Sequence, residues 1–318
     1  MDALAIYAEF FGSHIHVAPE YLVVTLLIAF AIYALRRPGT GFLRWLFPRA
    51  VYRHPSNLTD LKLFVLGRLL ALLGLFNKIT LTSLIAATLA QWLRQDGAPN
   101  AINPWLVAAV LFLITDFVIY WVHRIYHTTA LLWPIHSVHH SADVLTPLTA
   151  YRQHPLSDVI STLFTTLFLG LAQGLALGLS GVEFTGAQIA GVNGFFFGFA
   201  LLVANFRHSH IWISFGPFWE HLIISPAQHQ IHHSVATRHL DRNYGENFAI
   251  WDWMFGTLYL PAQPEELRFG ISDGKGQAAP QRHTGLISAL WVPLVDMARV
   301  LRPARRRGHK TTSDQSQN

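Results

Sequence analysis

The chain contains no cysteine and very little charge. None of its 318 residues is Cys, which excludes disulfides, thiolate zinc sites, iron–sulfur clusters and thiolate-ligated haem. Charged residues make up only 13% of the chain, whereas 52% of the residues are hydrophobic. Soluble domains carry roughly 25% charged residues, and disordered chains carry even more charge and less apolar surface. The composition is therefore typical of a membrane protein, whose lipid-facing surface must be apolar.

The balance of charge is basic, with a net charge of +5 and a pI near 9.6. Such a balance sometimes indicates nucleic-acid binding, but the high apolar content argues against a nucleic-acid partner here. In membrane proteins, Lys and Arg mark the cytoplasmic side instead. The first 20 residues contain neither Lys nor Arg, so we expect no cleavable signal peptide.

Five nearly uncharged stretches predict membrane-spanning helices, each approaching the ~20 residues that a span requires. They are residues 21–35, 79–93, 104–122, 159–182 and 184–206. We favour five spans, and four or six remain alternatives. Residues 61–76 are interrupted by Lys62 and Arg68, which fits an interfacial helix or part of a longer second span. The glycine-rich stretch 186–198 predicts close helix packing.

The distribution of Lys and Arg predicts the orientation of these spans. If the N-terminus lies outside, then segments 36–78, 123–158 and 207–318 lie inside. Only Arg94 of the 23 basic residues then falls at an outside boundary, as the positive-inside rule requires.

We expect an all-α polytopic membrane protein with about 4–6 transmembrane helices capped by a cytoplasmic, histidine-rich metal site. N-terminal spans and a linker occupy residues 1–104, and a histidine-box membrane domain occupies residues 105–260. Residues 261–301 predict a surface loop followed by an amphipathic helix at 286–301. Residues 302–318 form a basic tail that we expect to be disordered.

Histidine is the residue in excess, and thirteen of the 18 histidines lie within residues 123–154 and 208–239. The first window holds an H-x-x-x-H and an H-x-x-H-H motif, and the second holds another H-x-x-H-H. Positions i, i+3 and i+4 share one helix face, so each motif directs two or three imidazoles to one point. Eight to ten clustered histidines exceed what one ion binds, which indicates two metals. An all-nitrogen set suits iron or zinc.

Asp116 lies on one helical stripe with Tyr120, His123 and His127, at intervals that place them on the same face. A carboxylate inside a span usually faces a functional interior, and a metal-bound imidazole commonly donates its second N–H to a carboxylate. We expect Asp116 to orient such an imidazole, with an interhelical hydrogen bond as the alternative.

The motifs resemble those of the fatty acid hydroxylase/sterol desaturase superfamily of membrane di-iron enzymes, in particular its alkylglycerol-monooxygenase-like branch. That superfamily carries H-x-x-x-H and two H-x-x-H-H boxes in this order. The segments that carry the resemblance include Trp133-Pro-Ile-His-Ser-Val-His-His, Ser225-Pro-Ala-Gln-His-Gln-Ile-His-His and Asp241-Arg-Asn-Tyr-Gly. The resemblance covers about residues 105–260.

The resemblance implies two iron ions, a lipid substrate and dioxygen. Residues that match ligand positions are His123, His127, His136, His139, His140, His208, His229, His232 and His233. His154 is a possible tenth ligand. The chain departs from relatives at Ala204, where some have another histidine, and at Arg124, where the alkylglycerol enzyme has Glu.

The predicted activity is hydroxylation of a lipid: a fatty acyl chain, a sterol or an ether lipid. No flavin or nicotinamide fingerprint is present, so electrons must come from an external donor such as a cytochrome, a ferredoxin or a reductase. A lipid desaturase using the same site is an alternative, and a membrane metal transporter or sensor is another. Zinc hydrolysis is disfavoured because no box contains a Glu. We expect the site on the cytoplasmic face of a bacterial inner membrane or the endoplasmic reticulum.

Overall fold

The computed structural model describes residues 3–12, 15–74, 78–93, 103–180 and 186–302. Throughout these ranges the secondary structure is helical, and β-type pairing is confined to two isolated bridges, Ser234 with Phe269 and Ser272 with Ala278. The prediction of an all-α fold is confirmed.

Five long helices coincide, in their described residues, with the five predicted spans. They are α2 (Pro19–Arg36), α6 (Lys78–Leu93), α7 (Pro104–Thr128), α9 (Pro155–Ser180) and α10 (Gly186–Arg207). Within the described residues, three apolar segments are long enough to cross a membrane: Pro19–Arg36, Ala108–Thr128 and Pro155–Leu179. Leu81–Leu93 and Phe197–Arg207 are apolar but shorter. The number five therefore stays a prediction.

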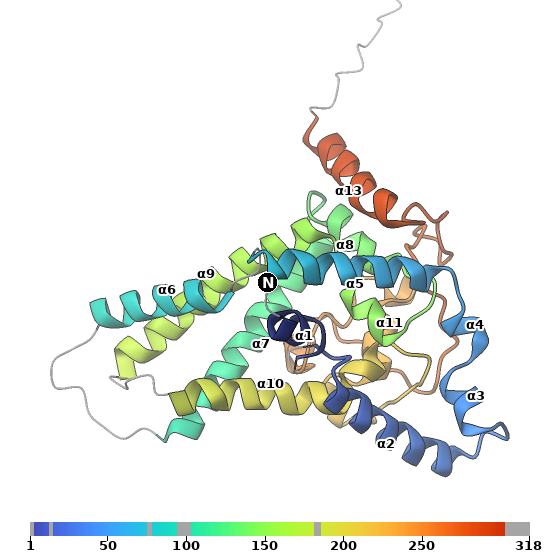
Figure 1. Cartoon of the computed structure of the whole chain (residues 1–318), viewed down its shortest axis with the longest axis horizontal. Helices are drawn as coiled ribbons and strands as arrows, with labels where there is room; N and C mark the ends of the chain where they lie inside the picture. Colours follow the sequence, from blue (N-terminus) through green and yellow to red (C-terminus); the bar gives the residue numbers. More distant parts are fainter. Residues whose placement is uncertain (1–2, 13–14, 75–77, 94–102, 181–185, 303–318) are drawn as a thin grey trace, which may run out of the picture.

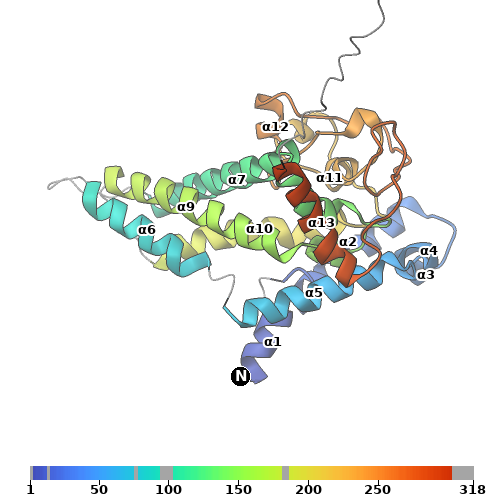
Figure 2. The ribbon, with the colours of Figure 1, turned by 90° about the horizontal axis from the view of Figure 1, so that it is seen from above.

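The long helices expose apolar side chains outward, as a lipid environment requires. Leu27 on α2, Leu84 on α6 and Leu163 on α9 are each more than half exposed. In water such surfaces would be unfavourable by roughly 25 cal/mol per Å², whereas in a bilayer they face acyl chains. Figures 1 and 2 show α6, α7, α9 and α10 extending together to one side of the molecule.

Helices α6 and α9 pack closely because glycines line their contact. A Cβ placed on Gly174 would lie 2.7 Å from the Cβ of Leu89 and 2.8 Å from the Ala86 carbonyl oxygen, and Gly170 and Gly178 are equally crowded. Small residues at four-residue spacing let the backbones approach, as in other membrane helix pairs.

The close packing that we predicted for residues 186–198 is wrong at the two glycines where the neighbouring atoms are described. Gly194 and Gly198 on α10 have no atom within 4 Å of the position that a Cβ would occupy. The glycine pattern that binds two helices lies instead on α9, where the spacing repeats every four residues on one face.

Most of the remaining α-helices lie toward the other end of the molecule (Figure 2). The remaining helices are α1 (Ala3–Phe11), α3 (Phe42–Leu46), α4 (Arg49–Tyr52), α5 (Ser56–Leu72), α8 (Trp133–His140), α11 (Pro226–His232), α12 (Ile250–Met254) and α13 (Leu286–Leu301). Helix α5 covers residues 61–72 of the stretch whose sequence fits either an interfacial helix or a longer span.

Residues 261–283 contain no helix, and α13 has the bounds predicted for the amphipathic helix. Its Ala289 packs against Leu63 of α5 and Val138 of α8, while Ile287 and Trp291 on the other face are exposed. Of the predicted tail, residues 303–318 lie outside the described residues.

Candidate metal centre

Three helices bring the histidine motifs together. His123 and His127 lie on the last turns of α7, and the two H-x-x-H-H boxes form α8 and α11. Both box helices have a proline in their first turn, where its missing N–H is not needed. In α11 the Ser225 hydroxyl also accepts from the Gln228 N–H, completing a capping box that fixes the helix start.

The nine predicted ligand residues separate into two groups. In each group, one ring nitrogen per histidine lies within 4.8 Å of the corresponding nitrogen of every other member. The first group contains His123, His127, His136, His140 and His232, and the second contains His139, His208, His229 and His233. We refer to them as the five-histidine group and the four-histidine group.

The spacing of nitrogens in the four-histidine group fits a single ion. The Nε2 atom of His208 lies 3.4 Å from that of His139, 3.1 Å from that of His233 and 3.1 Å from that of His229. Four nitrogens at about 2.1 Å from one ion in a tetrahedron would be roughly 3.4 Å apart. The imidazoles are thus arranged as ligands around a common point.

In the five-histidine group, backbone carbonyls fix two of the rings. The Nδ1 atom of His123 lies 2.8 Å from the Tyr244 carbonyl oxygen, and the Nδ1 atom of His232 lies 2.8 Å from that of Arg242. A carbonyl accepts only from a protonated nitrogen, so each bond selects the tautomer whose Nε2 lone pair is free for a metal.

Each H-x-x-H-H box contributes to both groups, but in opposite order. In α8 the first and last histidines, His136 and His140, belong to the five-histidine group, and His139 belongs to the other. In the second box His229 and His233 belong to the four-histidine group, and His232 to the five-histidine group. Equivalent positions of the two boxes therefore belong to different groups.

Burial keeps these imidazoles neutral. Desolvation lowers the pKa of His139 to about 3, with the charges of His123 and Arg152 contributing further. It also lowers the pKa of His140, His229 and His233 well below 6.5. Neutral imidazole is the form that binds metal.

Several buried ring nitrogens have no hydrogen-bond partner among the described residues, including Nε2 of His140 and Nε2 of His232. An unpaired polar atom in the interior is unfavourable by about 1–3 kcal/mol. A bound cation would satisfy these lone pairs, so the donor set fits a metal of the type predicted from the sequence.

Asp116 lies beneath the centre and holds a loop, not an imidazole. Its Oδ1 accepts from the Asn247 backbone N–H at 3.1 Å and from the Asn247 side chain at 2.8 Å. Its Oδ2 accepts from the Phe248 N–H and the Trp251 indole at 3.1 and 2.9 Å. The predicted contact with a metal-binding histidine is replaced by four bonds to residues 247–251.

His154 is not brought to either group. Its Nε2 lies 3.0 Å from the Leu290 carbonyl oxygen on α13, and its Nδ1 accepts from the Leu156 N–H at 3.1 Å. Both ring nitrogens are thus occupied by backbone groups. The placement argues against His154 as a tenth ligand, because a residue at the N-terminus of α9 faces α13 and not the centre.

The turn Asn243–Gly245 supports the centre, a role that was not predicted from the sequence although this segment carries part of the family resemblance. Asp252 accepts from the backbone N–H groups of Tyr244 at 2.9 Å and Gly245 at 2.7 Å, which holds the carbonyl that orients His123. A Cβ on Gly245 would lie 2.5 Å from the Phe248 carbonyl oxygen, so only glycine fits. Asn243, which adopts a positive φ, and Gly245 two residues later were the available turn signals in the sequence.

A buried ion pair fixes the C-terminal end of α8. Arg152 and Asp60 of α5 are 1% and 0% exposed, and their closest N–O distance is 2.7 Å. The guanidinium also donates to the Val138 carbonyl, to the Ser141 hydroxyl and to the His283 carbonyl. It therefore ties His139 and His140, which lie between Val138 and Ser141, to α5.

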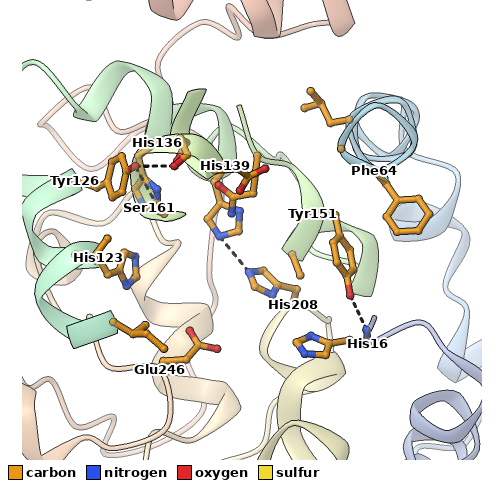
Figure 3. Close-up of a pocket in the computed structure, with 18 of the residues that line it drawn as sticks. His16, Phe64, His123, Tyr126, His136, His139, Tyr151, Ser161, His208 and Glu246 are labelled. Carbon is orange, nitrogen blue, oxygen red and sulfur yellow. Dashed lines mark hydrogen bonds between the residues drawn. The ribbon is translucent and has the colours of Figure 1, made fainter. Parts of the chain in front are cut away.

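Two cavities meet at the histidines. The first has a volume of about 410 Å³ and is lined by α5, α7 and α9 at Leu63, Phe64, Ile119, Val122, Ser157 and Ser161. Five of the nine histidines close it: His123, His136, His139, His208 and His229. Figure 3 shows several of them, with Glu246 and His16, around this space. We call it the helix cavity.

The second cavity has a volume of about 240 Å³ and is lined largely by loop residues at 234–241 and 270–274. The remaining four histidines, His127, His140, His232 and His233, form its inner wall. We call it the loop cavity. Each of the nine histidines thus lines one of the two cavities, and none lines both.

Apolar helices that end in nine converging imidazoles define an integral membrane protein with a histidine-rich candidate metal centre. Residues 108–257, which contain all nine, match the fatty acid hydroxylase family. This match confirms the family that the histidine motifs predicted.

Curated relatives carry several lipid-related names. The chain is 31% identical to alkylglycerol monooxygenase of Homo sapiens over 220 residues, which cover 69% of this chain and 44% of that protein. It is 27% identical to Delta(7)-sterol 5(6)-desaturase erg3C of Aspergillus fumigatus over 255 residues, or 76% and 75% of the two chains. It is 30% identical to very-long-chain aldehyde decarbonylase GL1-2 of Oryza sativa over 225 residues, or 64% and 32%.

The chain spans less than half the length of the alkylglycerol monooxygenases of Homo sapiens and Xenopus tropicalis, at 44% and 34%. No solved structure shows significant similarity to it.

Proposed function

We propose that the protein is a membrane-bound, non-haem di-iron oxygenase that hydroxylates a lipid with dioxygen and external electrons. The observation that carries this proposal is the division of nine imidazoles, seven buried and two partly buried, into two groups at the walls of the two cavities. The names of the relatives, which include a monooxygenase and a desaturase, support the same class of chemistry.

The five-histidine and four-histidine groups would each hold one iron ion. When bound, two irons supply the redox chemistry that activates dioxygen and oxidises an unactivated C–H bond, which redox-inert zinc does not. The chain's own residues keep the ligands neutral by burial and fix the tautomers of His123 and His232 through backbone carbonyls. Asp252 holds the turn that carries the Tyr244 carbonyl, and Asp116 holds residues 247–251 that follow it.

The helix cavity would bind the lipid. Leu63 and Phe64 of α5 and Ile119 and Val122 of α7 provide an apolar wall for an acyl chain. Ser157 and Ser161 on the α9 side offer hydroxyls near the same space, which suit the polar part of an amphiphile. The wall formed by the histidines places the carbon to be oxidised next to the metals and away from bulk water.

The electron donor would be a separate protein such as a cytochrome, a ferredoxin or a reductase. We place the centre on the cytoplasmic face, in a bacterial inner membrane or the endoplasmic reticulum, because that orientation puts nearly all Lys and Arg inside.

A lipid desaturase is the second candidate, and one comparison favours it. The Aspergillus desaturase matches over 75% of its own length, more than the alkylglycerol monooxygenases do. Both reactions begin by removing hydrogen from carbon and differ afterwards. Mass spectrometry of lipids from cells with and without the gene separates them, because hydroxylation adds one oxygen and desaturation removes two hydrogens.

Metal content tests the centre itself. We expect the wild-type protein, purified anaerobically under reducing conditions, to contain two irons per chain. His139→Ala and His232→Ala each remove a ligand from a different group, so both should lose iron and lipid oxidation. His154→Ala is the matched control, and it should keep both. Wild-type iron content and turnover in either ligand variant would contradict the proposal.

A further inference from the structure

The buried position of the nine imidazoles raises the question of how metal ions reach them. His233 is 2% exposed and His140 is 4% exposed, so an ion cannot bind from the open surface. Two cavities reach the imidazoles, and each cavity touches a different set of the histidines.

The helix cavity is poorly suited to a hydrated cation. Part of its wall is apolar, at Phe64 and Ile119, and the Arg68 guanidinium beside it pairs with Glu9 at 2.8 Å. Its Glu246 carboxylate is paired with the guanidinium of Arg207, which is 4% exposed. Asp158 also lines this cavity, and a cation entering there would have to shed water beside apolar side chains.

The loop cavity places a solvent-exposed carboxylate beside the histidines. Hydroxyl groups of Ser234 and Ser272 and the carboxylate of Asp241 line it. Asp241 is exposed, and its Oδ1 accepts from the Tyr244 hydroxyl at 2.9 Å. The neighbouring positive charge of Arg242 is directed to the Gly256 carbonyl at 3.0 Å. Oxygen ligands of this kind hold hydrated divalent cations in transit.

The loop cavity also leads to ring nitrogens that could bind a metal. The Tyr244 ring beside Asp241 lies 5.0 Å from the His127 ring and 5.8 Å from the His232 ring, measured between centroids. The Nε2 atoms of His140 and His232, both of which line the cavity, are buried and have no partner among the described residues.

We propose that the loop cavity is the route by which divalent metal ions load the centre, with the Asp241 carboxylate drawing the cation in. The inference rests on the metal centre proposed above. Because three members of the five-histidine group line the loop cavity and only His233 of the other group does, the five-histidine group fills first.

The test measures metal loading instead of catalysis. Metal-free full-length protein in lipid nanodiscs is mixed with Co²⁺, whose visible absorption changes on binding imidazole. Asp241→Asn removes the charge but keeps the Tyr244 contact, and Asn tolerates the left-handed φ of 58° at this position. We expect about tenfold slower loading at low salt, the same final stoichiometry, and a rate that no longer falls as salt is added.

Two control variants separate the route from general effects. Asp273→Asn removes the same charge from an exposed position in the same loop region, outside the cavity lining, and should load at the wild-type rate. Gly67→Leu narrows the helix cavity at a position with no neighbouring atom within 4 Å of its Cβ. It should weaken lipid binding and leave Co²⁺ loading unchanged.

The outcomes distinguish the two proposals. If the wild-type protein binds no Co²⁺, the metal centre itself is overturned. If it binds two ions but Asp241→Asn loads as fast as wild type, or Gly67→Leu slows loading, the loop-cavity route is overturned while the centre stands.

Discussion

The ion pair between Asp60 and Arg152 should be the strongest single electrostatic contribution to the stability of the centre. Asp60→Asn keeps the shape of the side chain but leaves the Arg152 guanidinium buried, charged and without its counter-charge. Both side chains are almost completely inaccessible to water, so solvent cannot compensate. Removing one partner of such a pair costs about 3–5 kcal/mol. Because Arg152 also bonds the Val138 carbonyl and the Ser141 hydroxyl, the end of α8 should loosen as well.

The assay is the free energy of unfolding in mixed detergent micelles, measured alongside iron content. Asp296→Asn is the matched control, since Asp296 pairs with Arg282 and Arg299, which are 51% and 64% exposed. Exposed pairs contribute only about 0.2–1 kcal/mol. We expect Asp60→Asn to be destabilised several times more than Asp296→Asn and to lose iron. Equal losses in the two variants would refute the argument that burial makes the Asp60 pair important.

Two further predictions concern pH and helix packing. Burial lowers the pKa of His139 to about 3 and that of His283 to about 4, so below pH 6.5 the unfolded metal-free chain binds protons that the folded chain does not. The free energy of unfolding of the metal-free protein should therefore fall as the pH falls from about 6.5 toward 4. A free energy of unfolding that does not change over this pH range would contradict the prediction. At the α6–α9 contact, Gly174→Ala should cost about 1–3 kcal/mol through overpacking, whereas Gly198→Ala, with open space at its Cβ, should be neutral or stabilising. The free energy of unfolding of each glycine variant, measured in micelles, tests this prediction. Equal stability of the two variants would disprove the close-packing argument.

The helical fold could be predicted because the relevant signals are local. A run of apolar residues forms one helix wherever it lies, and the spacing of H-x-x-H-H places three imidazoles on one face without knowledge of the rest of the chain. This is why the nine histidines that the structure brings together were found from spacing and resemblance.

What sequence reasoning missed depends on contacts between distant segments. The carbonyl of Tyr244 supports His123, a residue 121 positions earlier, and a backbone atom carries no residue-type signal. Asp116 sits on the expected stripe, but its oxygens meet residues 247–251 because that loop folds under the centre. The position of His154 in the sequence suggested a metal ligand. Only the packing of α13 shows that its ring nitrogen is hydrogen-bonded to the Leu290 carbonyl instead.

The alternate membership of the two H-x-x-H-H boxes has an evolutionary consequence. Each box supplies ligands to both groups, and His123, His127 and His208 complete the two sets. A substitution that tilts α8 or α11 must disturb ligands of both. We therefore expect selection to act on the two groups together, since a change that moves either box helix affects ligands of both metals.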